Sequence, residues 1–447
     1  MTTENGISSL WKKEDWWAVW LGLGIVACAI VFFAAGTTLG PLAVSPPRDW
    51  TAVSTVASHF AQHWVWYVVL LAVFGAVFTV STTIMGFRPA HYVPGFLLIY
   101  VVSVLILVVS QSRFFHTYSL EAPLVALILG LVVGNAARMP RWLESSLRTE
   151  YYIKTGIVLL GATLPLTAIV TAGPVAFLQA TIVSVCTWLI MFFVATRFFG
   201  MDKRFGAVLG AGGAVCGVSA SIAVGGAVKA DKEHVAISIS IVSLWALVMI
   251  FFLPLASKAL GLHPGVAGAW IGTSEFADAA GYAAAQTIAS HTGTEAAIQT
   301  FTLMKVIGRD IWIGIWAFVL AIVSSTMWER RQAAGDRAVH AAVIWDRFPK
   351  FVIGFIVASV VMSLLVASSS ADVAAEITPR LIAPIKTLRT WTFVFTFLCI
   401  GLTTRFRELA KFGMPPFWAF TVGVLVNVPL GYFLSTVVFA DYWMAVH

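Results

Sequence analysis

Apolar stretches of roughly 20 residues recur along almost the whole chain, separated by short polar loops. A helix of about that length crosses the hydrocarbon core of a bilayer, so the pattern predicts an all-α, polytopic membrane protein with about 11 to 13 transmembrane helices. The ninth and tenth candidates could each be a broken or re-entrant element. The candidate spans lie near 17–36, 64–86, 91–110, 121–137, 152–171, 175–196, 205–228, 235–255, 265–290, 296–328, 350–367, 390–404 and 414–437.

Composition supports this interpretation. Of the 447 residues, 59% are hydrophobic and only 11% are charged, and the mean hydropathy is +0.89. One soluble core could not bury that much apolar surface, so lipid must be the solvent for most of it. The lipid bilayer is therefore the first expected partner, and a set of separate soluble domains is excluded.

The charged residues predict the orientation. The chain carries 28 Lys and Arg against 21 Asp and Glu, but these lie mostly in short loops, which indicates membrane topology and not nucleic-acid binding. We expect a multi-pass protein with the N-terminus in the cytoplasm and the C-terminus outside. Loops expected in the cytoplasm are those near 138–148, 197–204, 330–350 and 405–411, whereas 229–234 and 368–389 are expected outside although they are basic.

A glycine-rich span offers the first candidate site. The segment 205–228 is uncharged and holds seven glycines, whose simplest role is close helix packing through GxxxG spacings. The alternative is a discontinuous helix, broken near Gly212, Gly213 and Cys216. The second half-helix would then direct its N–H groups and positive dipole toward an anion. The anion-binding residues predicted there are Gly217, Val218, Ser219 and Ser221.

An acidic pair follows in the ninth span. Glu275 and Asp278 are three residues apart, so on a helix they share one face. Carboxylates at membrane depth normally face the bundle interior or a water-filled cavity. There they could carry a coupling proton or together hold a cation such as sodium. A position in a loop at the membrane surface is the other interpretation.

A basic pair lies in the tenth span. Lys305 and Arg309 stand four residues apart, with Asp310 adjacent. An unbroken helix over 296–328 would be about 50 Å long, which exceeds the ~30 Å hydrocarbon core, so it must tilt, overhang or break, with Gly308 as one place for a break. Lys305 and Arg309 could reach the interface along an overhanging helix, or form a buried site for an oxyanion.

Two segments, starting at Gly161 and at Gly401, repeat the same spacing of Gly, Thr, Gly and Phe. The expected topology would orient them oppositely, as in transporters built from inverted repeats. Coincidence and generic helix-end chemistry explain so sparse a match equally well.

Signatures of enzymes and ATP-driven pumps are missing from the sequence: there is no Walker A loop, HExxH, GxSxG or GxGxxG motif. The four cysteines lie in apolar spans without CxxC spacing, which favours neither disulfides nor a metal site. We expect no enzymatic activity, no catalytic residues, no cofactor and no structural metal.

Several motifs of the sequence resemble those of a known family. The segments GIVLLGATL at 156–164, GGAVCGVSAS at 212–221, HVAISISIVSL at 234–244, the Lys/Arg helix and GLTTRF at 401–406 are similar to those of the Putative Sulfate Exporter family of bacterial membrane transporters. The resemblance implies an inverted-repeat secondary transporter with broken helices. The family commonly has a His before an acid where this chain has Ser274 and Glu275.

The resemblance also suggests a domain organisation. Residues 1–120 would be N-terminal helices added to the family core, 121–328 the first part of the transporter core, 329–348 a cytoplasmic linker and 349–447 the C-terminal part of the core. The function expected is secondary-active export of a small inorganic or organic anion, sulfate or an organosulfonate, by alternating access. The alternatives are a proton- or sodium-coupled exchanger of another solute and a membrane-embedded enzyme. The chain could also assemble as a homo-oligomer.

Overall fold

The computed structural model describes residues 9–117, 122–137, 139–163, 166–328, 349–405 and 413–446. These residues form helices and connecting loops, and they contain no β-strand. Nine helices among them are long and apolar enough to cross a membrane. The expected all-α, polytopic membrane fold is therefore confirmed.

The chain divides into two compact units, each built from separate parts of the sequence. Unit 1 comprises 1–166 and 350–405, and unit 2 comprises 167–349 and 406–447. Residues 1–120 share a compact unit with later helices, and the domain organisation that the resemblance suggests stays a prediction. The linker expected at 329–348 lies outside the described residues.

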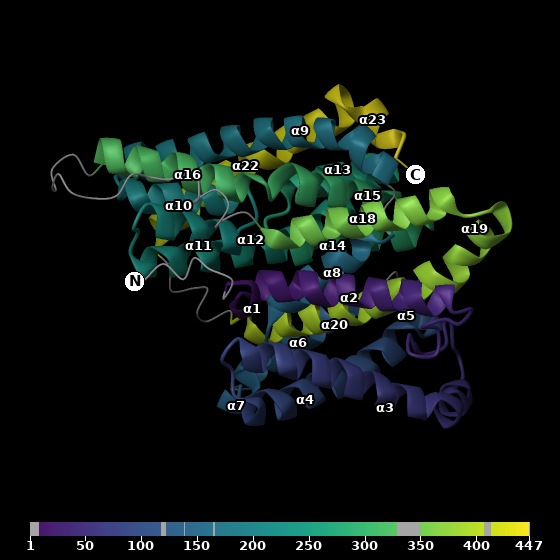
Figure 1. Cartoon of the computed structure of the whole chain (residues 1–447). Helices are drawn as coiled ribbons and strands as arrows, with labels where there is room; N and C mark the ends of the chain where they lie inside the picture. Colours follow the sequence, from purple (N-terminus) through teal and green to yellow (C-terminus); the bar gives the residue numbers. More distant parts are fainter. Residues whose placement is uncertain are drawn as a thin grey trace. The chain divides into compact units, whose positions relative to one another are not determined.

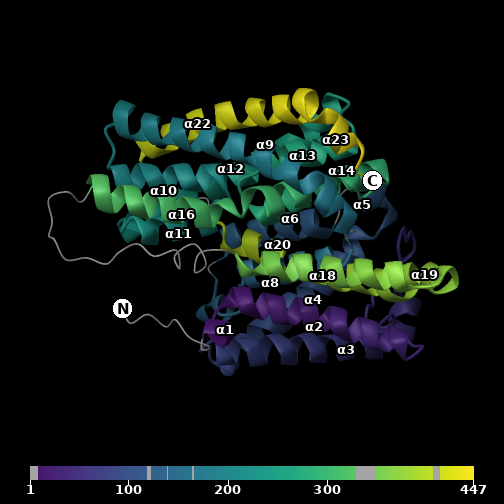
Figure 2. The same ribbon diagram turned by 45° about the horizontal axis from the view of Figure 1, so that its top comes forward.

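Unit 1 is a bundle of apolar helices (Figures 1 and 2). The tightest pairing joins α6 to α20, where Gly130 and Gly134 of α6 face Gly401 of α20. A Cβ on Gly401 would lie 2.5 Å from the carbonyl oxygen of Leu127. Small residues thus bring the two backbones into direct contact, as is common between membrane helices. Its elements are α1 (Ser9–Lys12), α2 (Glu14–Ala34), α3 (Val53–Ile84), α4 (Pro89–Ser110), α5 (Arg113–Thr117), α6 (Ala122–Ala136), α7 (Arg141–Glu144), α8 (Thr149–Gly161), α18 (Lys350–Ser368), α19 (Ala371–Ile377), η4 (Thr378–Ile382) and α20 (Ala383–Thr403).

The two glycines that open the repeated spacing have similar places in unit 1. Gly161 is the last residue of α8 and its Cα faces the carbonyl of Phe355 in α18, whereas Gly401 lies near the end of α20 and faces α6. Close packing near a helix end thus accounts for both. Residues 406–412 of the second copy lie outside the described residues, and the inverted repeat stays a prediction.

Unit 2 contains the three spans for which a break was considered, 205–228, 265–290 and 296–328. Long membrane-crossing helices lie beside shorter helical pieces (Figure 1). Its elements are α9 (Leu166–Phe193, starting at the unit boundary), η1 (Val194–Phe198), α10 (Lys203–Ala214), α11 (Val218–Ala227), α12 (Lys232–Ala259), α13 (Pro264–Ser274), α14 (Asp278–Thr292), α15 (Ala296–Thr302), η2 (Leu303–Arg309), α16 (Trp312–Val323), η3 (Ser324–Trp328), α22 (Met414–Phe433), η5 (Leu434–Val438) and α23 (Ala440–Met444).

The span expected at 205–228 is a re-entrant hairpin, named here hairpin 1. It consists of α10 and α11, which pack side by side and are joined by a turn at 215–217. Arg204, at the start of α10, donates from Nη1 to the carbonyl oxygen of Lys229, just after α11, at 3.2 Å. Both ends of the hairpin therefore lie at the same end of unit 2. The expected break in this span is correct, but the expectation that 229–234 lies opposite 197–204 is wrong.

The span expected at 265–290 is a second re-entrant hairpin, hairpin 2, formed by α13 and α14. Gly268, in the first leg, lies against the carbonyl of Ala297 at the start of α15. The second leg ends at Thr292, shortly before α15 begins. Both ends of hairpin 2 thus lie beside the start of α15. Because α12 crosses the unit between the hairpins, hairpin 1 and hairpin 2 enter from opposite ends of unit 2.

One long helix passes both hairpins. It runs through α15, η2 and α16, and its central part is a π-helix in which Asp310 N donates to Lys305 O at 2.9 Å. Gly308 lies in this π-helical segment, where a Cβ would be 2.8 Å from the carbonyl oxygen of Ala176. The irregularity expected here is thus a widened helical turn. Such turns occur frequently at functional sites.

Candidate functional site

The tips of the two hairpins touch each other in the interior of unit 2. Gly217 in hairpin 1 has φ +62° and ψ −97°, a conformation that essentially only glycine adopts. A Cβ on Gly217 would lie 2.5 Å from the carbonyl oxygen of Phe276 in hairpin 2. The Phe276 ring is fully buried against Phe420 of α22, with ring centroids 5.3 Å apart. Gly217 is therefore required both by the turn and by the approach of the second tip.

Lys305 links the two tips. Its Nζ donates to the carbonyl oxygen of Val215 in hairpin 1 at 2.9 Å and to that of Glu275 in hairpin 2 at 3.2 Å. It also lies 3.5 Å from Oδ1 of Asp278. The side chain has no exposed surface. Lys305 is thus a buried ammonium group held by both tips, and it does not lie at an outer interface.

Arg309 also links the two tips, and it donates to more carbonyl oxygens than Lys305 does. Its Nη1 donates to the carbonyl oxygens of Thr273 at 2.7 Å, Glu275 at 2.9 Å and Gly272 at 3.1 Å. From hairpin 1 it reaches Ala214 O at 3.3 Å through Nε and Gly213 O at 3.4 Å through Nη2. These carbonyls end α10 and α13, where a helix dipole is negative and carbonyls lack intrahelical donors. Arg309 and Lys305 therefore cap both first legs.

The predicted acidic residues lie beside this cap. Glu275 follows the last residue of α13 and is fully buried, and its Oε1 accepts from the backbone N–H groups of Phe276 at 2.8 Å and Ala277 at 3.2 Å. Its Oε2 is also buried and has no hydrogen-bond partner among the described residues. Asp278 is the first residue of α14, with 11% of its side chain exposed.

The second legs begin at the same place but are more accessible. Val218 and Ser219 open α11 and Asp278 opens α14; all three are partly exposed, whereas the ends of α10 and α13 are buried. The first turn of a helix presents backbone N–H groups and a positive dipole. The tips therefore expose two positive helix ends, while the negative ends are buried under Lys305 and Arg309.

The remaining predicted residues lie within hairpin 1. Ser221 is buried, with its Oγ 2.9 Å from Oγ of Ser238 in α12, and it faces Gly212 of the opposite leg. Gly213 lies against the side chain of Met191, and Cys216 is buried in the turn. Ser221 and Gly212 therefore hold the hairpin legs and α12 together.

The site also uses groups that the sequence did not indicate. The acceptors for Lys305 and Arg309 are backbone carbonyls, including those of Val215, Gly272 and Thr273. Every residue has a carbonyl, so no side-chain pattern distinguishes these. The contact of Phe276 with Gly217 likewise joins residues far apart in the chain. The only signal available was the local density of glycine around 206–217 and at 272.

Comparison with known proteins places the chain among bacterial membrane proteins. Residues 94–419 match the model of a family described as conserved hypothetical protein 698. A UPF0324 membrane protein of Rhodopirellula baltica is 32% identical over 89% of this chain and 73% of its own length. One of Nitrosomonas europaea is 28% identical over 91% of both chains.

A third relative, a UPF0324 membrane protein of Nitratidesulfovibrio vulgaris, is 31% identical over 83% of this chain but only 63% of its own length. No solved structure matches the chain. The family model spans both hairpins and the helix with Lys305 and Arg309. The chain belongs to the UPF0324 membrane-protein family, which is the Putative Sulfate Exporter family that its motifs resemble.

Proposed function

We propose that this protein is a secondary-active transporter that exports a small anion, such as sulfate or an organosulfonate, by alternating access. The observation that carries the proposal is the meeting of two re-entrant hairpins, whose second legs begin side by side with partly exposed residues. In transporters, discontinuous helices place half-helix N-termini at anionic substrates near the bilayer midplane. Val218, Ser219 and the start of α14 would form the anion site.

The charges of the site support an anion. Each helix start carries the equivalent of about half a positive charge. Lys305 and Arg309 donate to carbonyls, so their contribution to the substrate is a positive potential and not a direct contact. Of the described charged residues at the tips, Asp278 is paired with Lys305 at 3.5 Å. A protonated Glu275 carries no negative charge. Among the described residues at the tip of hairpin 2, the paired Asp278 is then the only carboxylate near the positive helix starts.

The corrected topology supports an orientation. Lys229 lies at the same end of unit 2 as Lys203 and Arg204, so the basic residues near both ends of hairpin 1 face one side. By the positive-inside rule we propose that this end faces the cytoplasm, in the inner membrane of a bacterium.

A thermal-shift screen tests the anion site. Sulfate, sulfite, thiosulfate, taurine or sulfoacetate should raise the melting temperature of the purified protein, since a ligand at 100 times its Kd stabilises the folded state by about 2.7 kcal/mol. Ser219→Val should remove most of that shift. Ser240→Val is the matched control, because the Ser240 hydroxyl donates to Ala236 O within its own helix. A flat response to every sulfur oxyanion would reject the proposed substrate class.

The second part of the proposal is coupling of transport to a proton or to sodium. The environment of Glu275 favours a proton. Its Oε2 is buried without a hydrogen-bond partner among the described residues, while Oε1 accepts two backbone N–H groups. A charged oxygen left in this way inside a membrane protein is costly, whereas a protonated one is tolerated. We propose that Glu275 binds the coupling proton as the anion is carried.

Glu275→Gln should therefore make anion flux in proteoliposomes insensitive to an imposed pH gradient. Glutamine retains an oxygen to accept the bonds from Phe276 and Ala277, so the tip should remain folded and should still give a sulfate thermal shift. Glu233→Gln, at the exposed start of α12, is the control and should behave like the wild type. An undiminished pH-gradient response in Glu275→Gln would exclude this residue, and a response to sodium alone would indicate sodium coupling.

A further inference from the structure

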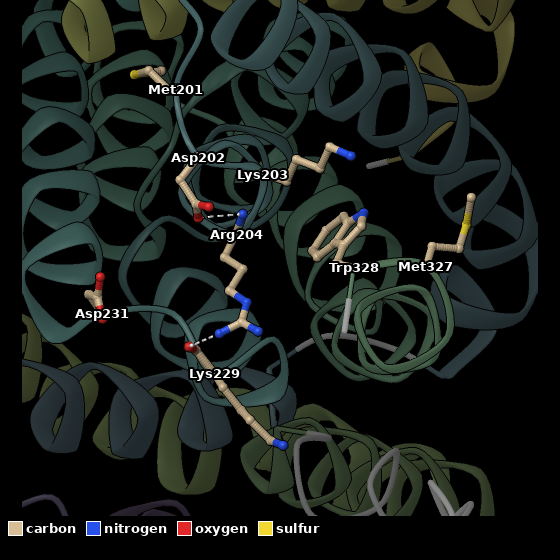
Figure 3. A pocket seen from close by; sticks show the side chains of 8 residues that line it. All are labelled: Met201, Asp202, Lys203, Arg204, Lys229, Asp231, Met327 and Trp328. Atoms are coloured by element: carbon tan, nitrogen blue, oxygen red, sulfur yellow. Dashed lines mark hydrogen bonds between the residues drawn. The ribbon is translucent and has the colours of Figure 1, made fainter. Parts of the chain in front are cut away.

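A basic pocket lies at the end of unit 2 where hairpin 1 begins and ends. Its cavity is about 480 Å³ and is lined by Met201, Asp202, Lys203, Arg204, Lys229, Asp231, Met327 and Trp328. Figure 3 shows Lys203, Trp328 and Met327 on one side, Asp231 on the opposite side and Arg204 between them. The proposed substrate site at the hairpin tips uses none of these residues.

The acidic residues of the pocket do not cancel its basic ones. Asp202 caps α10, because its Oδ1 accepts from the backbone N–H groups of Arg204 at 2.8 Å and Phe205 at 3.2 Å. The side chain of Asp231 is 85% exposed, and its carboxylate lies 3.9 Å from His234 Nδ1. Lys203, Arg204 and Lys229 therefore give the pocket an excess of positive charge.

The pocket lies where lipid headgroups are expected. One membrane-crossing helix ends at Phe198, another begins at Glu233 and a third ends at Val323, so the lining residues follow or precede the spans directly. Phe198 is 80% exposed and Met327 is 68% exposed, which leaves apolar surface beside the charges. Trp328 adds an indole of the kind that lies at membrane interfaces. Basic pockets between membrane helices bind anionic lipid headgroups.

We propose that this pocket binds the phosphate group of an anionic phospholipid, with the acyl chains alongside Phe198 and Met327. The headgroup would connect both legs of hairpin 1 with the end of the helix that carries Lys305 and Arg309. Direct bonds already join these parts: Arg204 Nη1 donates to Lys229 O at 3.2 Å, and Ser324 Oγ donates to Val228 O at 3.5 Å. Bound lipid therefore stabilises the base of hairpin 1.

The test is a lipid titration of the purified full chain in neutral detergent, followed by melting temperature. Short-chain phosphatidylglycerol should stabilise the wild type, and phosphatidylcholine should not. Lys203→Gln/Lys229→Gln keeps the Arg204 hydrogen bond to the backbone of residue 229, so hairpin 1 should still fold. This variant should need about 10- to 30-fold more phosphatidylglycerol for the same stabilisation, since each basic residue near an anionic lipid contributes about fivefold.

The matched control is Lys13→Gln/Lys258→Gln, which removes the same charge from two exposed positions outside the pocket. It should respond to phosphatidylglycerol like the wild type, and the pocket variant should retain its sulfate-induced shift. An equal loss of the lipid response in both double variants would show general surface attraction and overturn the proposal. Equal stabilisation by glycerol 3-phosphate or inorganic phosphate would also overturn it, because the site would then take a soluble phosphate.

Discussion

Arg309→Met is expected to abolish anion flux and to destabilise the protein by about 3–5 kcal/mol, the usual cost of removing one partner of a buried charged network. The guanidinium donates to carbonyl oxygens of both hairpins, and methionine offers no donor to replace it. Those carbonyls would remain buried at the ends of α10 and α13, where the helix dipoles are negative. Melting temperature and flux in proteoliposomes measure the two effects.

Two further variants make this result interpretable. Arg309→Lys keeps the positive charge but not the planar fork, so it should fold with a smaller loss of stability and transport poorly. Arg88→Met changes an exposed arginine at the start of α4 and should leave both measurements unchanged. If Arg309→Met retained wild-type stability and flux, the carbonyls would have other donors and Arg309 would not belong to the site.

Gly217→Ala should give the second large effect, a loss of flux together with a destabilisation of about 2–4 kcal/mol from backbone strain and overpacking. Alanine at φ +62° is strained, and its Cβ would lie 2.5 Å from the carbonyl oxygen of Phe276. Because that oxygen belongs to the backbone of hairpin 2, the tips would have to separate. Denaturation in detergent and flux in proteoliposomes provide the measurements.

The chain offers a control that separates strain from collision. Gly261 also has φ +62°, but a Cβ there would meet no atom within 4 Å. Gly261→Ala should therefore show only the cost of the backbone conformation, about 1–2 kcal/mol, and should retain flux. Equal effects of the two substitutions would mean that the contact between the hairpin tips contributes nothing to folding or transport.

The re-entrant hairpins explain a conflict in the distribution of charge. The positive-inside rule and thirteen crossing spans disagree at Lys229, which is basic but expected outside. Hairpin 1 returns to the side from which it enters, as the Arg204 bond to Lys229 O demonstrates, and hairpin 2 does the same at the opposite end. Neither hairpin crosses the membrane, so the expected number of crossings falls by two. An even change leaves the sides expected for the later loops the same.

The sequence alone determined the membrane-protein class, most helix positions and the candidate charged residues. All three follow from the length of the apolar runs and from the charged residues inside them. Both are local features of the sequence, and a bilayer constrains them directly. The family was also recognisable from short motifs, such as GGAVCGVSAS at 212–221. The boundary expected between the spans 152–171 and 175–196 was wrong, because α8 ends at Gly161 and α9 runs from Leu166 through Pro174.

Only the tertiary structure decided how the charged residues are used. Lys305 and Arg309 were candidates for an interfacial position or for a buried oxyanion site, and in the structure they donate to carbonyls at the ends of α10 and α13. The accessible positive groups are instead the starts of α11 and α14. Side-chain spacing cannot reveal this arrangement, because its acceptors are backbone groups and because it depends on two hairpins meeting across long stretches of chain.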